Sequence, residues 1–160
     1  MRPVRVYADT SVFGGLFDVE FHFDSREFFD EVESGRFRLV ISPIIELELQ
    51  EAPEQVRKSF EKLARIAETI AISDEARALR DAYIDARVIG ERYLTDALHV
   101  ALATVAGCRA IISWNFKHIV HFDKIPLYNG VNRAMGYGEI AVHSPQEVID
   151  YEASEDGQDF

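Results

Sequence analysis

Residues 93–119 read YLTDALHVALATVAGCRAIISWNFKHI, and this stretch decides the fold. An Ala-rich, apolar segment from about 92 to 106 ends at a glycine, which predicts a buried helix. Residues 110–113 form a short apolar run, which predicts a strand that ends at a turn containing Asn115. Asp96 lies near the start of the helix, where free backbone amides favour a carboxylate. The same carboxylate could also hold a metal ion, so this stretch raises a structural and a chemical question.

Short apolar strands alternate with helices along the rest of the chain, which predicts a parallel sheet covered on both faces. The expected strands are residues 4–8, 37–41, 69–72, 110–113 and 139–142. The expected helices are residues 24–34 (N-cap Asp24 or Ser25), 43–52, 54–66, 74–89, 92–106 and a short one after Ser144-Pro145. Serine caps and N1 prolines define several of these starts.

The composition predicts one globular domain at residues 1–151, followed by an acidic, disordered tail at 152–160. A net charge of −11 argues against a protein held on nucleic acid by bulk charge. A nucleic-acid substrate would therefore have to meet a local basic patch or bound cations. Cys108 is the only cysteine, and neither a signal peptide nor a membrane-spanning run is visible. These features predict a cytoplasmic protein that does not bind membranes.

A second polar stretch follows the first expected strand directly. Asp9 comes straight after residues 4–8, and Thr10 and Ser11 follow it. Ligands bind beyond the carboxyl ends of parallel strands, so Asp9 and Asn115 are expected at one edge of the sheet. Asp9 could instead be a solvated N-cap, and the two hydroxyls could cap the helix or bond a metal-bound water.

Further carboxylates have competing interpretations. Glu46 and Glu48 are about 200° apart on a helix, so at most one faces a common site, and their spacing does not choose between them. Asp96 could be a helix residue favoured by the dipole, or a site residue, because a buried carboxylate is costly when unpaired. Asn115 could be a turn residue or a neutral oxygen donor. His99 is expected to be a packed, hydrogen-bonded histidine.

Oxygen donors without cysteine favour Mg²⁺ or Mn²⁺ over a zinc site. Such ions activate water and neutralise charge at a phosphodiester, which makes this a nuclease-like set of residues. Phosphatases and phosphotransferases use similar sets. A phosphatase with Asp9 as nucleophile would usually carry a second aspartate two residues later, where this chain has Ser11.

The chain as a whole resembles a PIN domain of the VapC-like ribonuclease type. The matching stretches are YADTSVFGG (7–15), SPIIELEL (42–49), TDALHVALATV (95–105), SWNFKHIV (113–120) and the terminal GYGEIAVHSPQEVI (136–149). The resemblance implies a three-layer α/β/α sandwich with a mainly parallel sheet of four to five strands. It also implies a Mg²⁺- or Mn²⁺-dependent endoribonuclease that cleaves single-stranded RNA by attack of water on the phosphodiester.

The resemblance also implies roles for individual residues. The family's first acid falls on Asp9 and its hydroxyl partner on Thr10 or Ser11. Its helix glutamate falls on Glu46, which on this ground is preferred to Glu48.

The third acid of the family falls on Asp96, which completes the expected metal ligands. A fourth position, often aspartate, falls on Asn115, a common variant that removes one charge from the catalytic set.

Such nucleases commonly act as toxins, are inhibited by a small antitoxin protein and form homodimers. The resemblance therefore implies these partners, with a non-catalytic PIN-like interaction module as the alternative. The side chains expected to meet RNA are Lys58, Lys62, Arg65, Lys117, His118 and Arg133.

Overall fold

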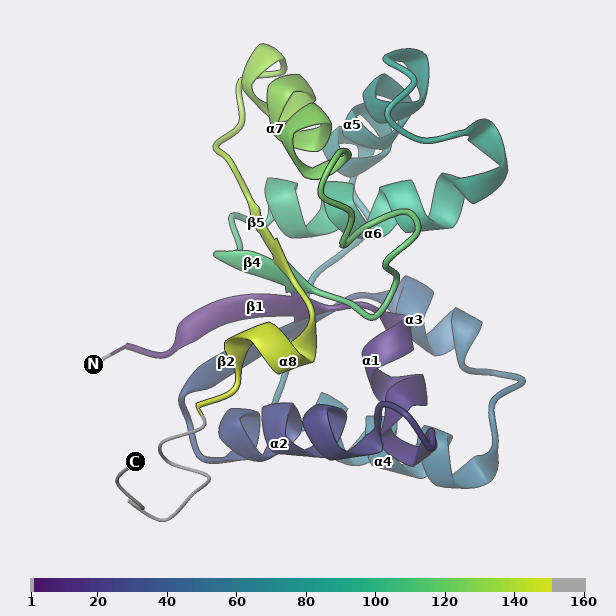
Figure 1. Cartoon of the computed structure of the whole chain (residues 1–160), viewed down its shortest axis with the longest axis vertical. Coiled ribbons are helices and arrows are strands. Elements are labelled where there is room, and N and C mark those ends of the chain that lie inside the picture. The colour runs from purple at the N-terminus through teal and green to yellow at the C-terminus, as the bar shows by residue number, and fades with distance from the viewer. Residues whose placement is uncertain (1, 151–160) are drawn as a thin grey trace.

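A five-stranded parallel sheet lies between two layers of helices in the computed structural model, which describes residues 2–150 (Figure 1). The strands are β1 (Val4–Ala8), β2 (Phe37–Ile41), β3 (Glu68–Thr69), β4 (Ala110–Ile112) and β5 (Ala141–His143). Their order is β3-β2-β1-β4-β5, and every neighbouring pair is parallel. The expected three-layer α/β/α sandwich is confirmed. The acidic segment 152–160 lies outside the described residues.

The helices divide between the two faces of the sheet (Figure 1). One layer contains α1 (Thr10–Gly14), η1 (Gly15–Phe17), α2 (His22–Glu33), α4 (Glu54–Ala64) and α8 (Pro145–Val148). The other contains α5 (Asp74–Asp85), η2 (Glu91–Tyr93), α6 (Leu94–Val105) and α7 (Ile125–Ala134). Helix α3 (Pro43–Glu48) lies beside α1, near the strand ends. No helix within residues 2–150 combines the length and apolarity needed to span a membrane.

Helix α6 is the buried helix expected from the opening stretch. Every residue from Ala97 to Thr104 is buried, because the helix packs between the sheet and α5. A helix that is apolar on all sides requires such an enclosed place. Helix α6 ends at Val105, and Gly107 adopts a positive φ of 71° just beyond it, as the glycine stop predicts.

The start of α2 differs from the expectation. The helix begins at His22 rather than at 24, and neither Asp24 nor Ser25 caps it. Asp18 Oδ1 accepts hydrogen bonds from the backbone nitrogens of Glu20 and Phe21, and so forms the turn that precedes the helix. Ser25 is buried, and its hydroxyl accepts a hydrogen bond from the Trp114 indole.

Helix α7 was not expected from the sequence. Its sequence, IPLYNGVNRA, contains two asparagines and a glycine, which are poor helix formers. Tertiary contacts compensate for this low helix propensity. Asn132 accepts a hydrogen bond from the Tyr83 hydroxyl. The side-chain amide of Asn129 donates to the backbone oxygen of Ile140 and accepts from its backbone nitrogen.

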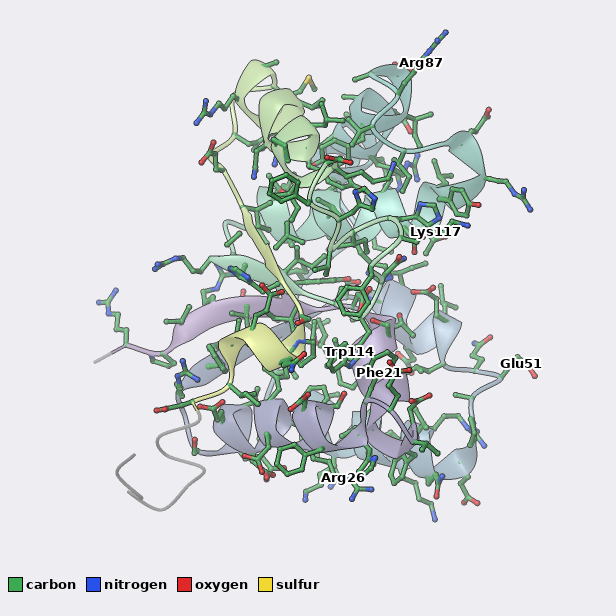
Figure 2. The ribbon with its side chains drawn as sticks, in the orientation of Figure 1. Phe21, Arg26, Glu51, Arg87, Trp114 and Lys117 are labelled. Carbon is green, nitrogen blue, oxygen red and sulfur yellow. The ribbon has the colours of Figure 1, made fainter. Side chains whose placement is uncertain are left out.

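Gly15 lies in close contact with Ser25 of α2 and with Trp114, which follows β4. A Cβ atom at this position would lie 2.7 Å from Ser25 Oγ and 2.9 Å from Trp114 Nε1. These two atoms form a 2.8 Å hydrogen bond with each other, and Phe21 stacks on the Trp114 ring with centroids 4.3 Å apart (Figure 2). Gly15 is therefore needed for space rather than for backbone freedom, since its φ is −67°.

We predict that Gly15→Ala lowers the free energy of unfolding by about 1–3 kcal/mol, as added atoms do in a well-packed interior. Gly14→Ala is the matched control, because nothing lies within 4 Å of a Cβ there and the residue is helical. It should be neutral or stabilising by up to about 1 kcal/mol. Denaturant unfolding followed by the fluorescence of Trp114, the only tryptophan, measures both. Equal stabilities of the two variants would show that Gly15 is not needed to leave space for Ser25 and Trp114.

Candidate functional site

Three neighbouring strands end in polar residues at one edge of the sheet. Asp9 follows β1, Ser42 follows β2 and Ser113 follows β4. The chain passes from β1 to β2 and β3 on one side and then crosses to β4 and β5, so the order reverses between β1 and β4. Open parallel sheets bind ligands beyond the strand ends at such a point. The candidate site is therefore the edge formed by Asp9 and Ser113.

Hydroxyl groups from two segments contact the Asp9 carboxylate, which is only 3% exposed. Its Oδ1 accepts hydrogen bonds from Ser11 N at 3.1 Å and from Ser11 Oγ at 2.5 Å. Its Oδ2 accepts a hydrogen bond from Ser113 Oγ at 2.7 Å. Ser11 Oγ also accepts from the backbone nitrogen of Trp114 at 2.8 Å. Asp9 is thus the N-cap of α1 and also a buried carboxylate with a fixed direction.

The charge of Asp9 is not balanced by an ion pair. No Lys or Arg pairs with it among residues 2–150. Burial raises the pKa of its carboxyl group, and the charge of Asp96 adds to that effect, whereas His99 and the two serine hydroxyls oppose it. A buried carboxylate near a like charge is costly, and a divalent cation would relieve that cost.

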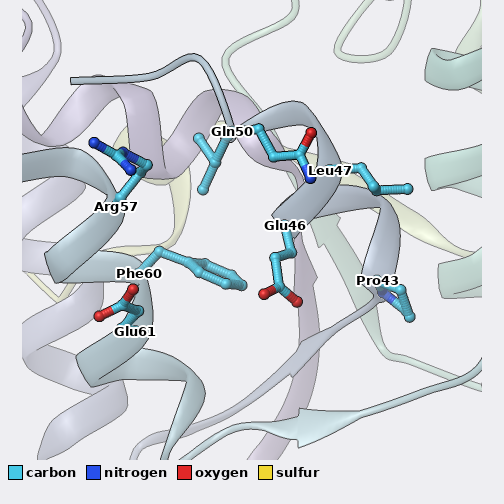
Figure 3. Close-up of a pocket in the computed structure, with 8 residues that line it drawn as sticks. Pro43, Glu46, Leu47, Gln50, Arg57, Phe60 and Glu61 are labelled. Carbon is cyan, nitrogen blue, oxygen red and sulfur yellow. The ribbon is translucent and has the colours of Figure 1, made fainter. Parts of the chain in front are cut away.

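Helix α3 directs Glu48, and not Glu46, to this edge. Glu48 Oε1 accepts hydrogen bonds from Thr10 Oγ1 and from His99 Nε2, both at 2.6 Å. Glu46 is exposed and lines a hollow of about 430 Å³ between α3 and α4, where it lies beside Phe60 (Figure 3). Two residues that are about 200° apart on one helix cannot share a site. The structure therefore places Glu48, and not the expected Glu46, beside Thr10 and His99 at this edge of the sheet.

The Glu48 carboxylate is partly exposed and held at one oxygen. Its side chain is 33% exposed. Burial alone would raise the pKa of Glu48, but the hydrogen bond and charge of His99 and the bond from Thr10 hold it below its ordinary value. Both bonds fall on Oε1, and Oε2 has no hydrogen-bond partner within residues 2–150. Glu48 is therefore an ionised carboxylate with one oxygen free for a ligand.

Asp96 lies in the first turn of α6, as expected, and Tyr93 is the N-cap of this helix. It is partly buried, and its charge acts on Asp9. Within the described part of the chain, no three Asp, Glu, His or Cys side chains are arranged to hold a metal ion. The oxygen donors suit a hard divalent cation, but binding one would require these carboxylates to converge.

Asn115 acts as a turn residue in this structure. Its Oδ1 accepts a hydrogen bond from the backbone nitrogen of His118 at 2.9 Å. Its backbone oxygen accepts from Ile119 and Val120, and its own nitrogen donates to Ser113 Oγ. Of the two interpretations, the structural one is supported directly, and the link to Ser113 connects this turn to Asp9.

Lys117 and His118 lie beside the start of α6, where Asp96 is located. The Lys117 ammonium is 5.9 Å from the centroid of the Tyr93 ring, and the His118 ring packs on the same ring with centroids 3.7 Å apart (Figure 2 labels Lys117). Burial lowers the pKa of His118, whereas the charge of Asp96 opposes that effect. Neither ring nitrogen of His118 has a hydrogen-bond partner within residues 2–150.

The basic residues of α4 form a separate, exposed surface. Lys58 pairs with Glu54 at 3.1 Å, and Lys62 pairs with Glu33 at 3.6 Å. Arg65 follows the helix as its C-cap and is exposed. Because acidic neighbours offset two of these charges, this surface is a weaker candidate for contact with a polyanion than Lys117.

Of the residues at this edge, Ser113 was not predicted from the sequence, whereas the structural role of His99 was. Ser113 was missed, although it is the polar residue that ends the apolar run AIIS at 110–113. His99 is 1% exposed and has a hydrogen-bond partner at each ring nitrogen, which confirms the expectation of a packed, bonded histidine.

Comparisons with known proteins agree with this architecture. VapBC2 from Rickettsia felis bound to a DNA fragment from its promoter shares the fold with a TM-score of 0.58 and 11% identity, over 88% of this chain and 98% of that one. FitAcB from Neisseria gonorrhoeae gives 0.56 and 12% over 89% and 99%. VapC20 from Mycobacterium tuberculosis, a Sarcin-Ricin loop cleaving toxin, gives 0.53 and 12% over 84% and 98%. At these identities the likeness concerns the fold alone.

The family comparison is more specific. No curated protein matches the sequence. The family model described as PIN domain matches residues 6–125, which include the end of β1 with Asp9, helices α3 and α6, and β4 with the turn that follows it. Because this match spans most of the chain and contains the whole candidate site, the protein belongs to the PIN domain family.

Proposed function

We propose that this protein is a ribonuclease that hydrolyses phosphodiester bonds of single-stranded RNA, with Asp9, Glu48 and Asp96 as ligands of Mg²⁺ or Mn²⁺. One observation carries the proposal: Asp9 is a buried carboxylate at the reversal point of the sheet, near the charge of Asp96 and without a basic partner in residues 2–150. Membership of the PIN family supports nuclease activity. The fold shared with VapC20, a toxin that cleaves the Sarcin-Ricin loop, supports RNA as the substrate.

In the proposed site, different residues would bind the cation, orient Asp9 and contact the RNA. A bound divalent cation would supply an activated water and would neutralise charge at phosphorus. Ser11 and Ser113 fix the Asp9 carboxylate, whose Oδ2 accepts one hydrogen bond within residues 2–150 and keeps a lone pair for a ligand. Lys117 would meet a phosphate of the RNA, which the net charge of −11 otherwise repels.

We further propose that the nuclease is the toxin of a toxin–antitoxin pair and forms a homodimer. The support for an antitoxin partner is the fold shared with VapBC2 and with a toxin-antitoxin complex from Klebsiella pneumoniae, which has a TM-score of 0.55 and 19% identity over 74% of this chain and 93% of that chain. The homodimer is what the resemblance to the family implies. Expression of the wild-type chain should arrest growth, and expression of Asp9→Asn should not. A small protein encoded beside it should restore growth and co-purify with it.

The second candidate is a non-catalytic interaction module with a PIN fold. It is favoured by the finding that residues 2–150 contain no side-chain group already arranged to hold a metal ion. Calorimetry with Mn²⁺ separates the two, because an interaction module should show no binding at millimolar concentration.

We predict that Asp9→Asn and Asp96→Asn each lower the rate of Mn²⁺-dependent cleavage of single-stranded RNA by at least about 100-fold, since loss of outer partners alone costs about 10–100-fold. Asp85→Asn, an exposed carboxylate at the end of α5, is the control and should cleave like wild type. Cleavage by both site variants at the wild-type rate would show that the site is elsewhere.

We predict that Glu48→Gln loses activity to a similar extent and that Glu46→Gln does not. The two variants make the same chemical change two residues apart, but only Glu48 contacts Thr10 and His99. Cleavage rates and Mn²⁺ affinity should be measured for both. A loss confined to Glu46→Gln would reverse the assignment.

We predict that Asp9→Asn is at least as stable as wild type in EDTA at pH 7. The pKa of Asp9 is raised in the folded state, so ionisation at pH 7 lowers the free energy of unfolding. This difference should shrink as the pH falls and the wild-type carboxyl group becomes protonated. Mn²⁺ at 100 times its Kd should stabilise only the wild type, by about 2.7 kcal/mol. Urea unfolding with and without Mn²⁺ tests this, and a wild type that is clearly more stable in EDTA would contradict it.

A further inference from the structure

A continuous chain of hydrogen bonds runs through the core to the proposed site. Ser42 Oγ lies 2.8 Å from the Tyr7 hydroxyl, and the Tyr7 hydroxyl lies 2.7 Å from His99 Nδ1. On the other side of the imidazole, His99 Nε2 lies 2.6 Å from Glu48 Oε1, which Thr10 Oγ1 also contacts. Ser42 makes no side-chain cap to α3, although it stands at the N-cap position. Its hydroxyl is hydrogen-bonded to Tyr7 instead.

The direction of each bond follows from the chemistry of the groups. The Glu48 carboxylate only accepts hydrogen bonds, so the proton of a neutral imidazole lies on Nε2. His99 Nδ1 then accepts from the Tyr7 hydroxyl, whose oxygen accepts from Ser42. Burial raises the pKa of Tyr7 well above its ordinary value, so this hydroxyl keeps the proton that it donates.

Core packing alone does not require these polar groups. Tyr7 is 0% exposed and His99 is 1% exposed, among the apolar residues of β1 and α6. Apolar side chains of similar size would fill this space without needing partners, whereas a buried polar group that loses its partner is costly. Of the two ends of this series of hydrogen bonds, Ser42 is buried and Glu48 is partly exposed.

Resting on the function proposed above, we infer that Tyr7 and His99 are positioning residues, which hold Glu48 Oε1 so that Oε2 is directed at the metal ion. Hydrogen-bond partners of ligating carboxylates commonly fix their orientation in this way. His99 would act on Glu48 directly, and Tyr7 would act through His99. Neither residue is assigned contact with the RNA or with the cation.

The test is the Mn²⁺ affinity of the full chain, measured by calorimetry for wild type, Tyr7→Phe, His99→Leu and His99→Gln. His99→Leu should weaken binding by about 10- to 100-fold, because it removes the donor to Glu48. His99→Gln keeps an amide donor for Glu48 and should recover part of this loss. Tyr7→Phe should give a smaller loss, and adding it to His99→Leu should cause no further loss, because both act along one chain.

A matched control separates positioning from general destabilisation. Tyr83→Phe removes another fully buried hydroxyl, whose partners are Asn132 of α7 and, at 3.5 Å, Thr104 near the end of α6. Neither Tyr83 nor these partners are hydrogen-bonded to Glu48 or His99 in the described residues. It should lower the free energy of unfolding without changing Mn²⁺ affinity. If His99→Leu and Tyr7→Phe bind Mn²⁺ as wild type does, or lose no more affinity than Tyr83→Phe, the positioning role is wrong.

Nuclear magnetic resonance provides a readout that does not depend on the metal. In the metal-free protein, the ¹⁵N shifts of His99 should show a protonated Nε2 and a bare Nδ1 in the neutral ring. A proton on Nδ1 would overturn the chain as described. Failure of the wild type to bind Mn²⁺ and to cleave RNA would instead refute the proposed function, so the two outcomes are distinguishable.

Discussion

The burial of the Asp9 carboxylate is the constraint on which this edge of the sheet depends. A charge in that position needs several donors, and the structure supplies them from two segments that are about a hundred residues apart in sequence, Ser11 and Ser113. Ser11 in turn accepts from Trp114 N, and the Trp114 ring is held by Ser25 in the space left by Gly15. One carboxylate thus connects the ends of β1 and β4 with α1 and α2.

Local patterns in the sequence were sufficient for β1, β2 and β4, for most helix starts and for the place of Asp9 after β1, because each depends on neighbouring residues. The two edge strands were less well placed: β3 is Glu68–Thr69 instead of 69–72, and β5 is Ala141–His143 instead of 139–142. The choice between Glu46 and Glu48 was not local, since it depends on how α3 is rotated about its axis against α1 and α6. Ser113 was missed because its importance arises from the pairing of β4 with β1. Helix α7 was missed because contacts such as the one made by Asn132, and not propensity, stabilise it.

The charge distribution of the protein is compatible with an RNA substrate only through local compensation. The chain is strongly acidic, and both lysines on α4 are paired with glutamates. Long-range attraction of RNA is therefore weak, and affinity would come from the cation and from close contacts such as Lys117. The hydrogen bonds through His99 would matter in the proposed site, because an affinity that comes from a bound cation depends on how well the cation's ligands are oriented.

The strand order has a consequence for how the protein is made. The central strand β1 is synthesised first, but its neighbour β4 and the hydroxyl of Ser113 come more than a hundred residues later. During translation, Asp9 therefore lacks the hydrogen bond from Ser113 until most of the chain has left the ribosome. A nascent or truncated chain that ends before residue 110 cannot assemble the site. The topology would thus delay the onset of the proposed nuclease activity until synthesis is nearly complete.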